Sequence, residues 1–202
     1  SGDVSAVTLT TTGNLYDVIF QEDVTVTNDV TFAAIRNLDI GGATDDTATF
    51  TGGLDTATNV TGTVTIAGTI QTAGAQMDLD AVTLAAATTL KTDGNSATGD
   101  ANINIGAVGV TLNDNLTITS TGTVDFQGVV NLGTGNLDVT IDTATEGTDT
   151  LVIDQTITAN AIDFTGSGAA RGDTLDIDQN LAAGTSLTLD NLQTVAVAQD
   201  VD

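Results

Sequence analysis

Histidine and cysteine are both absent from this chain of 202 residues. Serine and cysteine catalytic triads need a histidine base, and iron–sulfur and most zinc centres need cysteine or histidine ligands. Without cysteine there is also no disulfide framework. These absences exclude most hydrolase mechanisms and leave carboxylates as the main reactive groups.

Proline and tryptophan are also absent, Tyr16 is the only tyrosine, and aromatic residues make up 3% of the chain. The interior must therefore be filled by Val, Ile, Leu and Ala side chains and by threonine methyl groups. Straight-chain helix formers are scarce, whereas β-branched residues, which suit a pleated sheet, are abundant. We therefore expect an all-β protein. No apolar run approaches 18 residues, so we expect no membrane insertion.

Positive charge is scarce: three basic residues face 27 acidic ones, and the net charge is −24. Such a chain repels nucleic acid and anionic membrane surfaces, so neither is expected as a partner. Nearly all the acids are aspartates, which favour turns because they bond to their own local backbone. Short carboxylates also bind Ca²⁺, which is the one cofactor we consider.

Short units of alternating polarity fill the whole length and predict strands with one wet face. They begin at Val7, Val24, Leu38, Val64, Val82, Ile103, Leu116, Val124, Leu137, Ile162, Leu175, Leu187 and Val195. Clusters of Gly, Asn, Asp, Ser and Thr separate these units, as expected for turns and loops.

The spacing of these units favours a parallel β-helix of about 21 residues per rung. Units at Val82, Ile103 and Val124 are 21 residues apart, as are Leu116 and Leu137, and Val130 and Leu151; Leu175 and Val195 are 20 apart. The segment 61–70 recurs in similar form at 121–130, about three rungs further on. Two related hairpins would give the same similarity, so an antiparallel β-sandwich or jelly roll is the alternative.

Residues 1–202 are expected to form a single β-solenoid domain. No segment offers an amphipathic helix that would cap a solenoid end, and an uncapped end exposes backbone groups that pair with another strand. We expect a segment of a longer fibre or a subunit that stacks end to end, with the terminal strands around Val4–Leu9 and Leu187–Val197 as the contacts. The chain starts at Ser1 without a basic and apolar leader, as would a chain exported with its signal peptide already removed.

The Thr-, Gly- and Asp-rich runs 116–126 and 135–141 resemble β-solenoid repeats of large bacterial surface proteins, namely filamentous-haemagglutinin-like adhesins and autotransporter passengers. The resemblance is compositional and covers most of the chain. It implies an extracellular or cell-surface, elongated, non-enzymatic scaffold, and it transfers no functional residue.

Four aspartates are candidate calcium ligands. Asp149 and Asp173 lie in Gly-Thr-Asp-Thr-Leu and Gly-Asp-Thr-Leu runs that resemble part of the glycine-rich calcium-binding nonapeptide, and Asp45 and Asp46 lie in a glycine-rich loop. The tripeptide 171–173 spells a cell-attachment sequence whose plainer explanation is coincidence. Asn59 and Asn115 begin N-glycosylation sequons.

The leading hypothesis is an extracellular structural protein without enzyme activity. It would stack with copies of itself into a filament, sheath, surface layer or biofilm material, or form the rod of an adhesin. About ten rungs would span roughly 50 Å at the usual strand spacing. One alternative is an adhesin module that binds glycans or a cell surface. Another is a carboxylate-dependent, polysaccharide-cleaving β-helix enzyme, for which Asp176 and Asp178 are expected to share one face of a strand.

Overall fold

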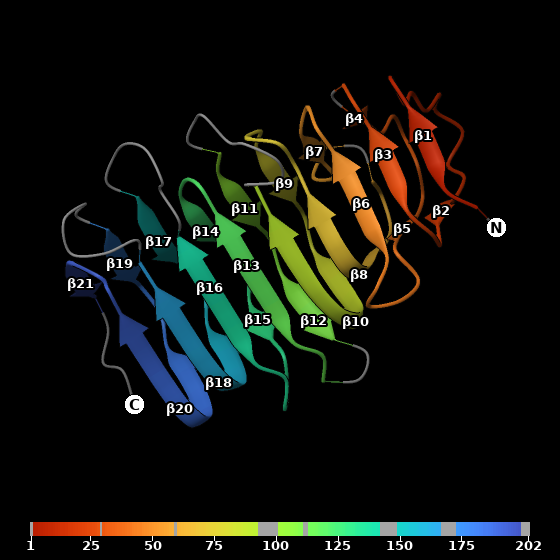
Figure 1. Cartoon of the computed structure of the whole chain (residues 1–202). Helices are drawn as coiled ribbons and strands as arrows, with labels where there is room; N and C mark the ends of the chain where they lie inside the picture. The colour runs from red at the N-terminus through yellow and green to blue at the C-terminus, as the bar shows by residue number, and fades with distance from the viewer. Residues whose placement is uncertain are drawn as a thin grey trace.

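The computed structural model describes residues 2–28, 30–58, 60–92, 101–110, 113–141, 149–166 and 173–198. Within these residues the regular structure consists of β-strands, and every strand pairing is parallel. The chain winds into a β-solenoid of about 7 turns (Figure 1). The all-β parallel β-helix is thus confirmed, and the antiparallel sandwich or jelly roll is excluded.

Each turn contributes one strand segment to each of three faces. Face 1 contains β2 (Val18–Phe20), β5 (Leu38–Ile40), β12 (Val108–Val110), β15 (Val130–Asn131) and the first halves of β8 (Val64–Gln71), β10 (Val82–Lys91), β18 (Ile157–Thr165) and β20 (Leu181–Asp190). Face 2 contains β1 (Val4–Ala6), β3 (Val24–Val26), β6 (Thr47–Phe50), β13 (Leu116–Ser120), β16 (Leu137–Ile141) and the second halves of β8, β10, β18 and β20.

Face 3 is a separate eight-stranded sheet. It contains β4 (Val30–Thr31), β7 (Leu54–Asp55), β9 (Met77–Leu79), β11 (Ile103–Ile105), β14 (Val124–Phe126), β17 (Thr150–Ile153), β19 (Thr174–Ile177) and β21 (Thr194–Val197). Each of its eight strands is one turn of the coil away from the next, so face 3 spans seven turns. Face 2 has one further strand, β1, at the N-terminal end.

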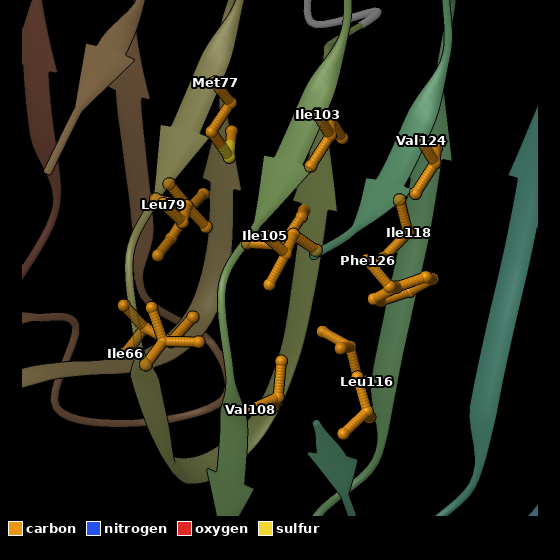
Figure 2. Close-up of a cluster of buried hydrophobic side chains, with 14 of the residues drawn as sticks. Ile66, Met77, Leu79, Ile103, Ile105, Val108, Leu116, Ile118, Val124 and Phe126 are labelled. Carbon is orange, nitrogen blue, oxygen red and sulfur yellow. The ribbon is translucent and has the colours of Figure 1, made fainter. Parts of the chain in front are cut away.

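The core is a set of stacked aliphatic and phenylalanine columns. On face 3, Met77, Ile103 and Val124 occupy equivalent positions on successive turns, and Leu79, Ile105 and Phe126 form the next column. Figure 2 shows these side chains directed into the same interior as Ile66, Val108 and Leu116 from the other faces. All of them are buried, and each such burial contributes about 1.5–3 kcal/mol.

Outward positions explain the abundance of threonine. On face 2, Thr47, Thr69, Thr89 and Thr117 stack on four successive turns, each in register with the next. A β-branched side chain with a hydroxyl group suits this position, because it packs on its neighbours along the column and still bonds to water.

The turns are longer and less regular than predicted. They average about 24 residues rather than 21, and equivalent residues Val64 and Val82 are 18 apart, whereas Leu90 and Ile118 are 28 apart. The eight strands of face 3 span about 34 Å at 4.7–4.9 Å per turn, and the nine segments of face 2 span about 38 Å. Both are shorter than the roughly 50 Å expected for ten rungs.

Three of the predicted stacking relations are correct. Ile103 pairs with Val124, Leu116 with Leu137, and Leu175 with Val195. Val82 and Val130 are on face 1, however, and so do not stack with Ile103 and Leu151 on face 3. The duplicated segments also differ in position, since Val64 is on face 1 and Val124 on face 3. Their similarity reflects two strand segments that follow a Thr-Gly-Thr corner.

Candidate assembly surfaces

Exposed large apolar side chains are concentrated at the two ends of the solenoid. Val129 is on the side of the coil, and the other nine lie in the first or last described turn. These nine are Val4, Val7, Leu15, Tyr16 and Ile19 at the N-terminal end, and Leu187, Leu189, Val195 and Val197 at the C-terminal end. Groups of exposed apolar side chains often mark protein–protein interaction sites.

The C-terminal end exposes positions that belong to the core. Leu187 and Leu189 of β20 are 40% and 41% exposed, whereas their partners one turn earlier, Ile162 and Phe164, are fully buried. On face 3, Val195 and Val197 are similarly exposed, while their partners on β19 are buried. These side chains occupy the last position of their core columns, and no described turn covers them.

The N-terminal end also exposes a core position, and a hollow lies beside it. Val4 of β1 is 38% exposed, whereas Val24 beneath it on β3 is buried. Between the first strands of faces 1 and 2 is a hollow of about 310 Å³. It is lined by Gly2, Val4, Ile19, Phe20, Gln21, Glu22 and Val24.

Both ends also present backbone edges. In the part of the chain that the structure describes, β20 and β21 pair on one side only, as do β1 and β2. An unpaired strand edge is a template for pairing with another strand. The two ends are different surfaces, because one is formed by the first turn of the chain and the other by the last turn.

An exposed ion pair reinforces the first turns. Arg36 donates from Nε and Nη2 to the two carboxylate oxygens of Asp17 at 2.8 and 2.7 Å, and the Nδ2 of Asn37 donates to Oδ1 at 2.9 Å. The hydrogen bond with Arg36 lowers the pKa of Asp17 and raises that of the guanidinium. The pair joins the segment before β2 to the segment before β5.

Stacked carboxylates raise pKa values on the sides of the coil. Asp138 on β16 pairs directly with Asp163 on β18, and partial burial followed by this like charge raises the pKa of Asp138. The pKa of Asp154, just after β17, is raised by burial and then by Asp125, Asp178 and Asp176. Ionised carboxylates at these positions oppose folding.

The calcium candidates fall into two separated pairs. Asp149 and Asp173 precede β17 and β19, occupy equivalent positions on consecutive turns and are buried. The backbone N–H of Asp149 lies 3.5 Å from Oδ1 of Asp173.

Asp45 and Asp46 lie instead between β5 and β6. The Asp46 carboxylate accepts the N–H groups of Gly42 and Ala43 at 2.6 and 2.9 Å, which is a local turn interaction. Among the described residues, no three acidic side chains gather in a way that could hold a metal ion. Calcium binding at either pair stays a prediction.

The remaining sequence candidates have varied positions. Asp173 of the tripeptide 171–173 is fully buried, which does not suit a cell-attachment site, and the other two residues are outside the described range, as is Asn59. Asn115 is exposed, and its Oδ1 accepts the N–H of Asn136 on the next turn at 2.8 Å. Asp176 and Asp178 lie on and directly after β19.

Other hollows lie along the sides of the coil. A groove of about 330 Å³ on face 1 has no acidic or basic side chain in its lining, which includes Gly62, Val82, Gly109 and Asn131. Two smaller hollows lie beside Gly133 and Gly184 and beside Gly53 and Asp78. The described residues form no helix that is long and apolar enough to cross a membrane.

The sequence and the fold were compared with known protein families, curated proteins and solved structures. No family model, no curated protein and no solved structure matches this chain.

Proposed function

We propose that this protein is a non-catalytic structural element of an extracellular filament, sheath or surface layer, in which β-solenoid subunits stack end to end. The observation that carries the proposal is the exposure of core positions at both ends. Leu187 and Leu189 are 40% and 41% exposed at positions that are fully buried one turn earlier. A second copy of the coil would cover them and pair with the free edge of β20 on face 2.

The sides of the coil suit an exposed filament. Outward positions carry threonine and aspartate, and the net charge of −24 keeps the sides of adjacent rods apart. The compositional resemblance to adhesin and autotransporter rods supports an extracellular or cell-surface location. In a rod segment of a longer adhesin, the same two ends would be covered by neighbouring turns.

The test compares the unmodified protein with two variants that introduce aspartate at exposed apolar positions, one at the C-terminal end and one on the side of the coil. Leu187→Asp combined with Leu189→Asp places carboxylates at the C-terminal end, whereas Val129→Asp places one at an exposed apolar position on the side. Sedimentation velocity and electron microscopy across a concentration series should show filaments for the unmodified protein and for Val129→Asp, and monomers for the end variant.

Two results would contradict the proposal. One is an unmodified protein that stays monomeric at the highest concentration. The other is assembly that Val129→Asp disrupts as strongly as the end variant. Circular dichroism should confirm that all variants retain the β-sheet signal.

A further inference from the structure

We propose that the subunits join head to tail in a single register, in which Leu189 of one copy stacks on Val4 of the next. This inference rests on the proposed end-to-end assembly and specifies its geometry. The occupant of each end is the opposite end of a second copy of this chain.

The register follows from an unbroken column on face 2. Val4 pairs with Val24, and the column continues through Ala48, Ile70, Leu90, Ile118, Val139 and Phe164 to Leu189. Each step preserves the inward orientation of the side chain. If the next copy continues the same column, Leu189 contacts Val4, and Asp190 pairs with Ser5 on the outward side. A shift by one residue would turn the inward side chains outward, so it is disfavoured.

The hollow at the N-terminal end favours this register over a shift by two residues. In the proposed register Leu187 lies opposite Gly2, two residues before Val4. Gly2 has no side chain, and nothing lies within 4 Å of the place where its Cβ would be. The adjoining hollow of about 310 Å³, lined in part by Val4, Phe20 and Val24, has room for a leucine side chain. A shift by two residues would place Leu187 on Val4 and leave this hollow unfilled.

The two contacting ends are different surfaces, so the interface is heterologous. An interface of this kind that does not close into a ring produces an open, polar filament. Face 2 contains nine stacked segments, from β1, β3, β6, β8, β10, β13, β16, β18 and β20. With one strand spacing at the junction, each subunit advances the filament by nine spacings, or about 42–44 Å.

Cysteine cross-linking tests the register directly, because the chain has no cysteine of its own. Residues opposite each other on adjacent parallel strands have Cα atoms about 4.8 Å apart, which allows a disulfide bond, whereas residues displaced by two positions are about 8 Å apart. We expect Val4→Cys with Leu189→Cys, and Ser5→Cys with Asp190→Cys, to give a ladder of disulfide-linked oligomers after mild oxidation.

The control is Val4→Cys with Leu187→Cys, which should give almost no ladder. The Ser5 and Asp190 pair is on the outer surface, so it keeps the test informative even if a core variant assembles poorly. Ladders from the control pair but not from the two matched pairs would overturn this register, as would an axial repeat outside about 42–44 Å in electron micrographs. Filaments with a different register would leave the proposed function standing, whereas the absence of filaments from the unmodified protein would contradict both.

Discussion

At the scale of single residues, the fold depends on a few positions where backbone or charge is constrained. The bend of β8 between faces 1 and 2 occurs at Gly68, which has a φ of 72°. A Cβ atom there would run into the backbone carbonyl oxygen of Asp46 on the preceding turn. At this bend, where the backbone has a positive φ and the preceding turn approaches closely, glycine is required for geometry and not only for flexibility.

Replacing Gly68 by alanine should destabilise the protein. The left-handed conformation costs an L-residue about 1–2 kcal/mol, and the contact with the carbonyl oxygen of Asp46 adds to this cost. The matched control is Gly109→Ala on β12, where nothing lies within 4 Å of the added Cβ. Urea unfolding followed by circular dichroism should show a clear loss for Gly68→Ala and little change, or a small gain, for Gly109→Ala. Equal losses of unfolding free energy for the two variants would show that the left-handed conformation and the close contact at Gly68 are not the cause.

Removing the charge of Asp138 should stabilise the protein at neutral pH. The pKa of Asp138 is raised above 3.8 by burial and by Asp163, so its contribution to stability is full below pH 3.8 and is lost as the pH rises through the folded-state pKa. Like charges opposite each other on adjacent strands cost about 0.2–1 kcal/mol. Asp138→Asn should therefore increase the free energy of unfolding by about that amount at pH 7.

The gain should disappear near pH 3, where the native carboxyl group is already protonated. Asp39→Asn is the control, because Asp39 pairs with Thr65 and Ile19 and has no carboxylate opposite it. Denaturant titrations at pH 7 and pH 3 measure the difference. A gain from Asp138→Asn that persists at pH 3 would rule out charge repulsion as its cause.

At the scale of strands, the alternating units predicted most elements but could not assign them to faces. Twelve of the thirteen predicted units are strand segments, and the exception is Val7–Leu9, which precedes an isolated bridge at Thr10. Short segments such as β4 and β7 have too few residues to show alternation. Units from different faces have the same pattern, because every face has one buried and one wet side.

The turn length was harder to predict because it depends on the corners. Ile103 and Val124 are one turn apart at the predicted 21 residues, whereas Leu90 and Ile118 need 28. The connection between faces 2 and 3 varies most in length: three residues separate β13 from β14, whereas 11 residues separate β10 from β11 and eight separate β16 from β17. Loop length is not constrained by the stacking of the core, so no fixed period describes the sequence.

The exposed ends could be predicted only in part. The sequence suggested terminal contacts around Val4–Leu9 and Leu187–Val197, because no capping helix was recognisable. The hollow beside Gly2 was not predictable, since it depends on which residues of faces 1 and 2 meet in the first turn. The buried stacking of Asp149 on Asp173 likewise needed the register of β17 and β19.

At the scale of the whole molecule, two opposing effects govern assembly. Apolar side chains on the first and last described turns favour contact. These turns are at opposite ends of the coil (Figure 1). The charge of −24 is spread over the whole chain and repels every other copy. The first effect acts only in contact, whereas the second acts over the screening length of the solution, so ionic strength shifts the balance between them.

Assembly should therefore strengthen with salt. The screening length falls from about 30 Å at 0.01 M to about 3 Å at 1 M, so repulsion between stacked copies decreases while the apolar contact remains. The critical concentration measured by light scattering should fall severalfold between 10 mM and 500 mM NaCl, and a rise on adding salt would contradict this balance.

A comparison of MgCl₂ with CaCl₂ at equal ionic strength separates charge screening from binding at a specific calcium site. If Asp149 and Asp173 bind calcium, CaCl₂ should raise the melting temperature more than MgCl₂ does, and Asp149→Asn should abolish the difference. Equal effects of the two salts would assign the whole response to charge screening and leave the stacked aspartates a purely structural role.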